Sequence, residues 1–461
     1  MKIADKNTKA VDLVRAALEK AKEYEDYHAF ISMNEAHALE RAREIDAKIE
    51  RGEPVGRLAG VPFALKDNYL SPEGHTTAAA KMLEDFPAPI TATAVAKIEA
   101  EGAIMIGRTN LDAYAHGGST ENSYFGPTSN AYDKERVAGG SSGGSAVAVA
   151  LGIVPFALGS DTGGSIRQPA SFNGVVGVKP TFGTVSRYGV VAMASSTDTM
   201  GCFANNVEDA NLVMSIMAGR DEKDSTTLAD FWTKDLADAT PKQKKIALIK
   251  DSMGEGIDPE VKAAIEKYAD KLKKAGYTVE EIDMPILKYA LAIYYIVVPA
   301  EVSSNLSRYD GIRYGLRSDK AKDLDAVYSM TRDEGFMPEN KRRIMIGNFV
   351  LSSGFFDAYY LKAQKARTLL IEAYNKAFEK YDALLCPVAP RPAFKIGENT
   401  SDPLQMYLED VMTVPASLAG LPAISVPAGK SKAGLPIGAQ LVGPRQSDQM
   451  LLNIAASVEE K

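Results

Sequence analysis

Two serine clusters flanked by glycines carry the most information in this chain: Gly139-Gly140-Ser141-Ser142-Gly143-Gly144-Ser145 and Asp161-Thr162-Gly163-Gly164-Ser165-Ile166-Arg167. The apolar run 154–158 lies between them and predicts a buried strand that leads into the second cluster. Glycines allow close approach of the backbone to a ligand. Serines among them either cradle a phosphate or act as nucleophiles beside N–H groups that bind an oxyanion. The phosphate-binding pattern Gly-x-x-x-x-Gly-Lys-Ser/Thr does not occur in the sequence, which favours a nucleophile.

Short apolar runs of the buried-strand type recur on both sides of these clusters. We expect strands at 61–65, 103–106, 154–158, 245–250, 277–282, 383–386 and 423–427. Helices are expected at 92–101, 143–151, 207–217 and 361–381, and also near the N-terminus, where Asn34 could cap one of them. Such a strand–helix–strand rhythm is typical of α/β folds with a mostly parallel sheet.

The polar segment 218–245 is the best candidate for a domain boundary. A chain of 461 residues would by length alone suggest two or three domains. Strands are expected on both sides of this segment, however, so one large sheet fits as well as two domains. We predict a single domain over residues 1–461, with N-terminal helices of about residues 1–55 that pack on its core.

Composition and charge narrow the class of protein. The net charge is −7, from 53 basic and 60 acidic residues, which disfavours broad binding to a polyanion such as tRNA. The only cysteines, Cys202 and Cys386, argue against a disulfide framework and for a reducing compartment. We found neither an apolar run of 18 residues nor a signal-peptide core. We therefore expect a cytoplasmic protein with no membrane partner.

The base that would activate a serine is not an obvious histidine. The four histidines stand in no recognisable triad context and are interpreted as surface or structural residues: His28, His37, His75 and His116. Lys66 is the better candidate, because it ends the apolar run 61–65 and would emerge from a buried strand into a cleft. Burial disfavours the charged ammonium and could leave enough neutral amine to accept a proton. Ser165 would be the nucleophile, and the N–H groups of Thr162, Gly163 and Gly164 could bind the oxyanion.

These segments together resemble the amidase signature family. The runs 139–145 and 159–170 match its signature almost letter for letter, and Ser141 lies 75 residues after Lys66 and 24 before Ser165, as that family's triad requires. The resemblance implies a large mixed β-sheet covered by helices on both faces. It also implies that Ser165 is the nucleophile, that Ser141 bridges from a cis peptide bond after Gly140, and that Lys66 is the base. No metal or organic cofactor enters the implied chemistry.

Within this family the chain looks like the glutaminase subunits of tRNA-dependent amidotransferases. The runs that carry this likeness are 117–123, 185–189, 195–198, 303–315 and 351–360. The likeness implies hydrolysis of glutamine to glutamate and ammonia. The ammonia would pass to a tRNA-binding B subunit, which with a small C subunit completes a heterotrimer. That partner would use ATP and Mg²⁺ to convert Glu-tRNA(Gln) to Gln-tRNA(Gln), Asp-tRNA(Asn) to Asn-tRNA(Asn), or both.

Selection of glutamine requires a cation for its α-carboxylate and an anion for its α-ammonium group. By resemblance these are Arg343 and Asp410, and Tyr294 adds a contact. One departure from the likeness is the run 201–205, where Cys202 replaces a proline expected to fix a local turn. Two alternatives stay open. A stand-alone amidase would act on small carboxamides and would not need Arg343 and Asp410 as a clamp for glutamine. A catalytically silent scaffold, in which the serines only build a tight loop, is disfavoured by the intact triad.

Overall fold

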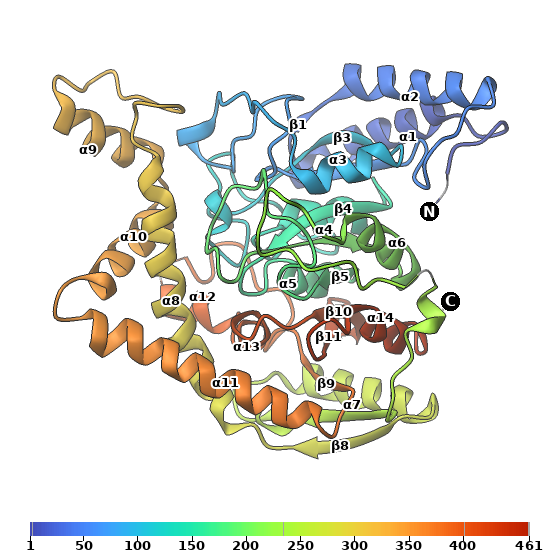
Figure 1. Cartoon of the computed structure of the whole chain (residues 1–461), viewed down its shortest axis with the longest axis vertical. Coiled ribbons are helices and arrows are strands. Elements are labelled where there is room, and N and C mark those ends of the chain that lie inside the picture. The colour runs from blue at the N-terminus through green and yellow to red at the C-terminus, as the bar shows by residue number, and fades with distance from the viewer. Residues whose placement is uncertain (2, 234, 401, 460–461) are drawn as a thin grey trace.

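A single mixed sheet forms the centre of the molecule (Figure 1). The computed structural model describes residues 1, 3–233, 235–400 and 402–459. The strands are β1 (Phe30–Met33), β2 (Pro62–Lys66), β3 (Ile104–Thr109), β4 (Phe156–Asp161), β5 (Val176–Lys179), β6 (Thr199–Ala204), β7 (Lys245–Ile249), β8 (Thr278–Ile282), β9 (Ala383–Pro387), β10 (Ala423–Lys430) and β11 (Pro436–Val442). The α-helices are α1 (Ala10–Glu23), α2 (Glu35–Glu50), α3 (Thr93–Ala100), α4 (Gly143–Ala150), α5 (Arg167–Asn173), α6 (Val207–Met217), α7 (Pro259–Lys274), α8 (Ala290–Asn305), α9 (Leu324–Gly335), α10 (Pro338–Leu351), α11 (Lys362–Phe378), α12 (Pro403–Leu408), α13 (Val414–Leu418) and α14 (Asp448–Ala456).

The strand order is β1-β3-β2-β4-β6-β5-β10-β11-β9-β7-β8. Strand β2 runs parallel to β3 and β4, and β7 runs parallel to β8 and β9. The strands between these two groups pair antiparallel, as does β1 at the edge. A mostly parallel sheet is therefore the wrong prediction, and the mixed sheet that the resemblance implied is confirmed. Parallel neighbours such as β2 and β3 are joined through a helix, whereas β10 and β11 need only a short turn.

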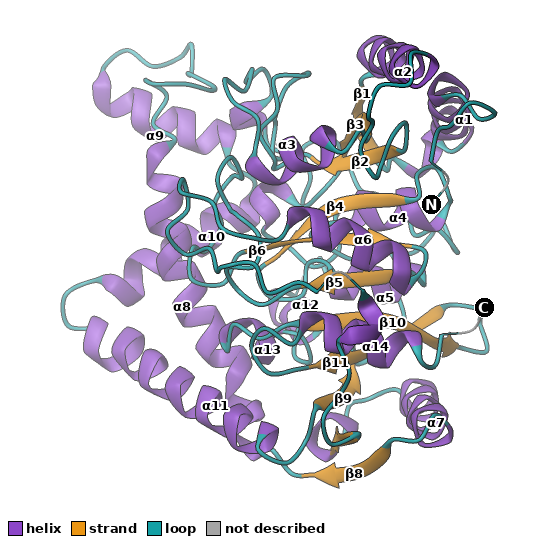
Figure 2. Cartoon of the chain, turned by 45° about the vertical axis from the view of Figure 1, so that its right-hand side comes forward, coloured by secondary structure: helices purple, strands orange, loops and turns teal. Residues whose placement is uncertain are grey.

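Helices lie on both faces of the sheet (Figure 2), and the strand side chains alternate between the apolar cores that these helices cover. On β2, Phe63 and Leu65 enter one core, whereas Ala64 faces the other. The first core packs against α3, α6, α7 and α14, and the second packs against α1, α2 and α4. Because successive side chains of a strand point to opposite faces, strands buried on both faces read as continuous apolar runs. This is why the runs 61–65 and 154–158 were visible in the sequence.

A layer of helices stands along one side of the sheet. Helices α8, α10 and α11 run there with α13, and they enclose a third apolar core with β7 and β9 (Figure 1). Helix α8 contacts both α10 and α11. Within the described residues, the segment Pro285–Arg308, which contains α8, is long and apolar enough to cross a membrane by length and composition alone. Half of its most apolar window is buried inside the molecule.

The expected elements are confirmed, with ends that move by a few residues, but several others were not anticipated. Four strands were missed: β1, β5, β6 and β11. Three of these have a glycine in their interior, which weakens the apolar pattern by which a strand is recognised. Gly201 of β6 has a packing reason, since a Cβ there would come within 2.0 Å of the Val178 carbonyl oxygen on β5. The strand thus requires glycine where the pattern would demand a side chain.

Two local predictions need correction. Asn34 does occupy the N-cap position of α2, but its side chain caps nothing and instead donates to the Glu73 carbonyl at 3.5 Å. The run 201–205 is not a turn. Cys202 lies in β6 between β4 and β5, and its buried thiol faces the Ala210 carbonyl at 3.8 Å. A cysteine therefore fills a core position in a central strand.

Candidate active site

Two parallel strands, β2 and β4, bring Lys66 close to the cluster that contains Ser165. Strand β2 ends at Lys66, and its parallel neighbour β4 ends at Asp161, the first residue of the cluster that contains Ser165. The carboxyl ends of parallel strands meet at one edge of a sheet, which is where α/β proteins place their sites. Lys66 and Ser165 are therefore held at the same edge although they are far apart in the sequence.

Lys66 is fully buried and bonded to the predicted bridging serine. Its Nζ donates to Ser141 Oγ at 2.8 Å and to Ser160 Oγ at 2.9 Å. Burial lowers the pKa of Lys66 to about 7, although the carboxylates of Asp112 and Asp161 oppose this by favouring the charged form. A large fraction of the amine is therefore neutral at pH 7 and able to accept a proton.

The loop before α4 holds Ser141 in place. The peptide bond Gly140–Ser141 is cis, as the resemblance implied. The Gly140 N–H donates to Gln168 Oε1 at 2.9 Å, and the hydroxyl of Thr120 donates to the Gly139 carbonyl at 2.7 Å. The space beside Gly140 is occupied, because a Cβ there would come within 2.2 Å of Asp112 Oδ2. Side chains that are distant in the sequence thus fix the backbone on both sides of the bridging serine.

Ser165 follows β4 and keeps its hydroxyl free. Within the described part of the chain this hydroxyl makes no hydrogen bond, while the Ser165 carbonyl accepts from the Ser142 N–H at 3.1 Å. The N–H groups of Thr162, Gly163 and Ser165 likewise donate to no group in the described ranges. The Gly164 N–H is engaged, because it donates to Asp161 Oδ1 at 2.9 Å. Free donors are therefore present beside Ser165, although not at every predicted position.

The loop 162–166, called the nucleophile loop after the role predicted for Ser165, is anchored by a buried ion pair. Arg167 and Asp161 have no exposed side-chain surface, and their Nη2 and Oδ1 atoms are 2.9 Å apart. Arg167 also donates to the Thr413 carbonyl at 2.8 Å and to Gln440 Oε1 at 2.6 Å. Because these acceptors come from the C-terminal part of the chain, the loop is fixed between β4, α13 and β11.

Arg343 lies on the inner face of α10 and is only 3% exposed. Its Nε donates to Glu339 Oε1 at 2.8 Å, and its guanidinium lies over the rings of Tyr295 and Tyr407. These two rings stack with centroids 3.8 Å apart, and the Tyr407 hydroxyl donates to the same Glu339 oxygen at 3.0 Å. The terminal nitrogens of Arg343 donate to none of the residues that the structure describes. Glu339 thus holds the guanidinium at Nε, and its two terminal nitrogens remain available to a ligand.

Asp410 lies near Arg343 and is tied to the nucleophile loop. Tyr295 spans the distance, since its ring lies under Arg343 and its hydroxyl is 3.5 Å from Asp410 Oδ2. Thr413 Oγ1 donates to the carbonyl of Gly163 at 2.6 Å, and its N–H donates to that of Asp410 at 3.1 Å. Burial raises the pKa of Asp410 to about 8, with Arg343 acting in the opposite direction.

Tyr294 closes the space beside the nucleophile loop. A Cβ on Gly163 would come within 2.5 Å of the Tyr294 hydroxyl oxygen, so the phenol lies directly against this glycine. Burial raises the pKa of the phenol and keeps it protonated at neutral pH. All three predicted substrate contacts therefore lie near the nucleophile loop.

Comparison with known proteins places the chain in a family. The Amidase family matches residues 12–452. The chain belongs to the amidase family. The glutamyl-tRNA(Gln) amidotransferase A subunit of Cyanothece sp. (strain PCC 7425 / ATCC 29141) is 49% identical to it over 466 residues, which cover 99% of the chain and 96% of the relative.

Solved structures of amidase-family proteins share the fold. The crystal structure of the glutamyl-tRNA(Gln) amidotransferase A subunit from Thermotoga maritima is similar with a TM-score of 0.81 and 40% identity, and the match covers 98% of this chain and 91% of that one. A chain from a vestigial protein complex, which reveals the origins of an s-triazine catabolic enzyme, matches with a TM-score of 0.86 and 30% identity over 98% of this chain and 95% of its own.

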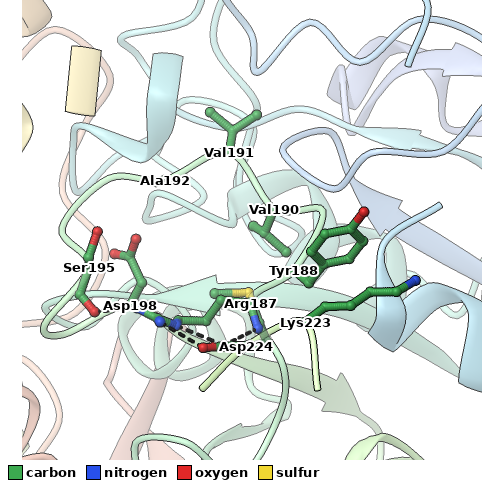
Figure 3. A pocket seen from close by; sticks show the side chains of 10 residues that line it. Arg187, Tyr188, Val190, Val191, Ala192, Ser195, Asp198, Lys223 and Asp224 are labelled. Atoms are coloured by element: carbon green, nitrogen blue, oxygen red, sulfur yellow. Dashed lines mark hydrogen bonds and ion pairs between the residues drawn. The ribbon is translucent and has the colours of Figure 1, made fainter. Parts of the chain in front are cut away.

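A small cavity adjoins this amidase site from the side of Thr162. The Thr162 hydroxyl donates to Asp198 Oδ1 at 2.7 Å, and Asp198 lines a cavity of about 230 Å³. Figure 3 shows Ser195 and Asp198 on one side of this cavity, Tyr188 and Lys223 on the other, and the ion pair between Arg187 and Asp224 along its floor. Among the residues that the structure describes, no group of three or more His, Cys, Asp or Glu side chains could hold a metal ion.

Several supporting residues were not found from the sequence. Ser160 and Asn68 flank Lys66, and the Asn68 amide donates to Ser160 Oγ at 3.0 Å. Both lie beside predicted motif residues, so adjacency was an available signal. No such signal marked Glu339 and the stacked tyrosines, because their relation to Arg343 exists only in the folded chain. His116, interpreted as a surface or structural residue, is buried with Nδ1 2.8 Å from the Asn340 amide of α10.

Proposed function

We propose that the chain is the glutamine-hydrolysing subunit of a tRNA-dependent amidotransferase. The single observation that carries this proposal is the arrangement of Arg343, whose Nε is held by Glu339 while its terminal nitrogens stay open near Asp410. A fork of this kind suits the two oxygens of an α-carboxylate, and a neighbouring carboxylate suits the α-ammonium on the same carbon. The relatives named as A subunits of glutamyl-tRNA(Gln) amidotransferases support the same substrate.

Hydrolysis would proceed through an acyl-enzyme. Neutral Lys66 accepts the proton of Ser141, which accepts the proton of Ser165 as its Oγ bonds to the carboxamide carbon. The tetrahedral intermediate then breaks its C–N bond. The proton returns from Lys66 through Ser141 to the leaving nitrogen, and ammonia departs. Water, deprotonated by the same route, attacks the ester, and glutamate leaves as Ser165 regains its proton.

The oxyanion of this intermediate needs N–H donors that are free before the reaction. Thr162 and Gly163 meet this requirement, as does the nucleophile's own N–H. Gly164 could contribute only if its N–H left the Asp161 carboxylate. Donors that are already in place lose no free energy to reorganisation during the reaction.

The partners follow from the same proposal. A glutaminase subunit supplies ammonia to a tRNA-binding B subunit, and a C subunit completes the enzyme. The B subunit uses ATP and Mg²⁺ to amidate Glu-tRNA(Gln), Asp-tRNA(Asn) or both. The net charge of −7 supports a protein that leaves most contacts with tRNA to its partner. We place this complex in the cytoplasm, in keeping with the two buried free thiols.

We also infer that residues 1–461 form one domain. The sheet continues across the segment 218–245, with β6 and β7 on opposite sides of it in the sequence. Helices α1 and α2 contact β3, which supports a packed N-terminal region.

Replacement of the nucleophile tests the mechanism. Ser165→Ala in the complex with B and C subunits is expected to abolish ammonia release from glutamine, while Ser329→Ala, at an exposed serine of α9, keeps wild-type activity. Ammonia is measured in a coupled assay, with intact mass used to detect the acyl-enzyme. Retained glutaminase activity in Ser165→Ala would exclude this nucleophile. Equal use of glutamine and of a neutral carboxamide by the wild type would favour a stand-alone amidase.

A further inference from the structure

The second half of α10 and the turn that leads to α11 expose an unusual set of apolar side chains. We call six of them the aromatic patch: Met345, Phe349, Leu351, Phe355, Phe356 and Tyr359. Their exposed fractions lie between 37% and 72%. Figure 1 shows this turn at the outer edge of the molecule, on the side where α8, α10 and α11 stand. The turn overlaps the run 351–360, which contains none of the predicted site residues.

The rings of the patch are packed against one another rather than scattered. The centroids of Phe349 and Phe355 are 4.3 Å apart, and those of Phe349 and Tyr359 are 5.7 Å apart. The last part of the turn, Phe356–Leu361, is π-helical, a rare conformation that is frequent at functional sites. Single exposed apolar residues need no explanation, but contiguous apolar patches mark interaction sites. Aromatic residues and methionine are also enriched at protein interfaces.

The patch and the substrate clamp occupy opposite faces of one helix. In α10, Arg343 and Gly347 are buried and face α8, whereas Met345 and Phe349 face outward. A protein seated on the patch would therefore contact the back of the helix that carries Arg343. This position connects the surface with the site without making the patch part of it.

We propose that the aromatic patch is the docking surface for a second, non-identical subunit of the amidotransferase, which presents an apolar face with carboxylates at its rim. This inference rests on the proposed function. The relatives are named as subunits, and the similar s-triazine chain comes from a protein complex. The carboxylates follow from Lys362 and Lys365, which are exposed beside the patch and form no ion pair within the described residues.

Other occupants fit the patch less well. RNA bases stack on open aromatic faces, but here the Phe349 ring packs against those of Phe355 and Tyr359, and the aliphatic Met345 and Leu351 offer no stacking surface. In a symmetric pair of identical chains the same surface meets itself, so Lys362 and Lys365 would approach their own copies. A different protein with complementary charge avoids both problems.

The test measures binding of the full chain to its B and C subunits. Phe349→Asp and Tyr359→Asp are compared with wild type by analytical ultracentrifugation and by binding kinetics on immobilised B–C subcomplex. Both positions are exposed, so the variants should keep the wild-type circular dichroism and Tm. Each variant is expected to weaken binding by about tenfold or more, because aromatic residues at interfaces are frequent hot spots. The matched control is Val55→Asp, at an exposed apolar residue near the N-terminal helices, which should bind as wild type.

A charge reversal tests the chemistry of the partner. Lys362→Glu combined with Lys365→Glu is expected to slow association by several-fold at low ionic strength, with the difference lost at about 0.5 M salt. Unchanged association kinetics at low salt would overturn the assignment of carboxylates to the partner's rim.

Each remaining outcome decides the proposal. Wild-type affinity in both aspartate variants overturns it, as does a self-association that these variants abolish. Loss of tRNA binding by the isolated chain would assign the patch to RNA instead. If the complex forms through the patch but releases no ammonia from glutamine, the docking surface stands and the proposed glutaminase function fails.

Discussion

Lys66 shows how burial sets the chemistry of one residue. Taking the ammonium out of water lowers its pKa to about 7, although three carboxylates nearby favour the charged form: Asp112, Asp161 and Asp198. Burial also raises the pKa of Asp112 and Asp198 to about 6, so their charges weaken as the pH falls. Desolvation outweighs attraction at this site, and the lysine is poised to exchange a proton near neutral pH.

The pH dependence of hydrolysis should reveal this group. Because the neutral amine is the active form in the proposed mechanism, kcat/KM for a neutral carboxamide is expected to rise with pH, with its midpoint near 7. With glutamine the rise should be steeper and extend to about 8, since Asp410 must also lose its proton to bind an ammonium group. Ammonia release measured from pH 5.5 to 9.5 tests both curves.

Substitutions separate the two titrations. Asp410→Asn should remove the part of the glutamine profile near pH 8 and leave the carboxamide profile unchanged. Lys66→Arg stays protonated at every pH and should be inactive. A flat carboxamide profile in the wild type would contradict the role of Lys66 as a base.

Glu339 is a positioning residue for Arg343. Its carboxylate receives the Arg343 Nε and the Tyr407 hydroxyl, and it also pairs with Arg342. Arg343→Lys should lower kcat/KM for glutamine roughly 10- to 100-fold, because a charge-assisted fork is lost. Glu339→Gln should raise KM for glutamine several-fold and change kcat little. In Glu339→Asp, KM should return toward the wild-type value only if the shorter carboxylate still accepts from Arg343 Nε.

A neutral carboxamide is the internal control for these variants, since it carries no α-carboxylate. Glu334→Gln, on the neighbouring helix α9, is the matched substitution and should behave as wild type. Equal losses with glutamine and with the neutral amide would show that the variants damage the fold rather than the clamp.

At the scale of elements, the contact between α8 and α10 positions Arg343, one of the two residues of the proposed glutamine clamp. Gly347 permits it, because a Cβ would come within 2.0 Å of the Pro299 carbonyl oxygen of α8. Gly347→Ala should therefore push the helices apart, lower the free energy of unfolding by about 1–3 kcal/mol and raise KM for glutamine. Chemical denaturation and steady-state kinetics measure the two effects.

Gly254→Ala is the matched control for this packing argument. Its φ is −78°, and an added Cβ would meet its nearest neighbour at 3.6 Å, an ordinary contact. Its stability should stay close to that of the wild type. A stable Gly347→Ala variant with unchanged KM would mean that α10 does not need this close approach.

At the scale of the whole molecule, Arg167 joins the two halves of the chain. It pairs with Asp161 after β4 and also bonds to Thr413 and Gln440 from the C-terminal part. Arg167→Ala leaves a buried carboxylate without its partner and should cost about 3–5 kcal/mol of unfolding free energy. Arg41→Ala, at an arginine on the surface of α2, should change little.

The ion pair between Asp161 and Arg167 also determines whether the stability of the fold rises or falls with pH. Burial raises the pKa of Asp161, but Arg167 and the neighbouring donors outweigh this and lower it below its usual value. The contribution of the ionised carboxylate is thus present at neutral pH and lost as the pH falls through the lowered pKa. Denaturation curves at pH 7 and pH 4.5 should show that Arg167→Ala costs less at pH 4.5, because the unpaired buried carboxyl of the variant takes up a proton there whereas Asp161 stays ionised in the wild type.

The sequence by itself determined the strands buried on both faces and the three residues of the predicted triad. Continuous apolar runs such as 61–65 mark strands without reference to the rest of the chain. Ser141 and Ser165 stand in two dense glycine–serine clusters, and the resemblance added Lys66 to them through its spacing. Arg343 and Asp410 were named only by resemblance, because nothing around either residue distinguishes it from a surface charge.

Tertiary structure alone decided the direction of the central strands and the surroundings of each charge. Antiparallel pairing of β5, β6, β10 and β11 follows from how their connections cross the sheet, which no local pattern encodes. The engagement of Gly164 by Asp161, and the support of Arg343 by Glu339 and stacked tyrosines, likewise arise only when distant segments meet. Apolar periodicity is a local property of the chain, whereas hydrogen-bond partners and desolvation depend on what the fold places around each residue.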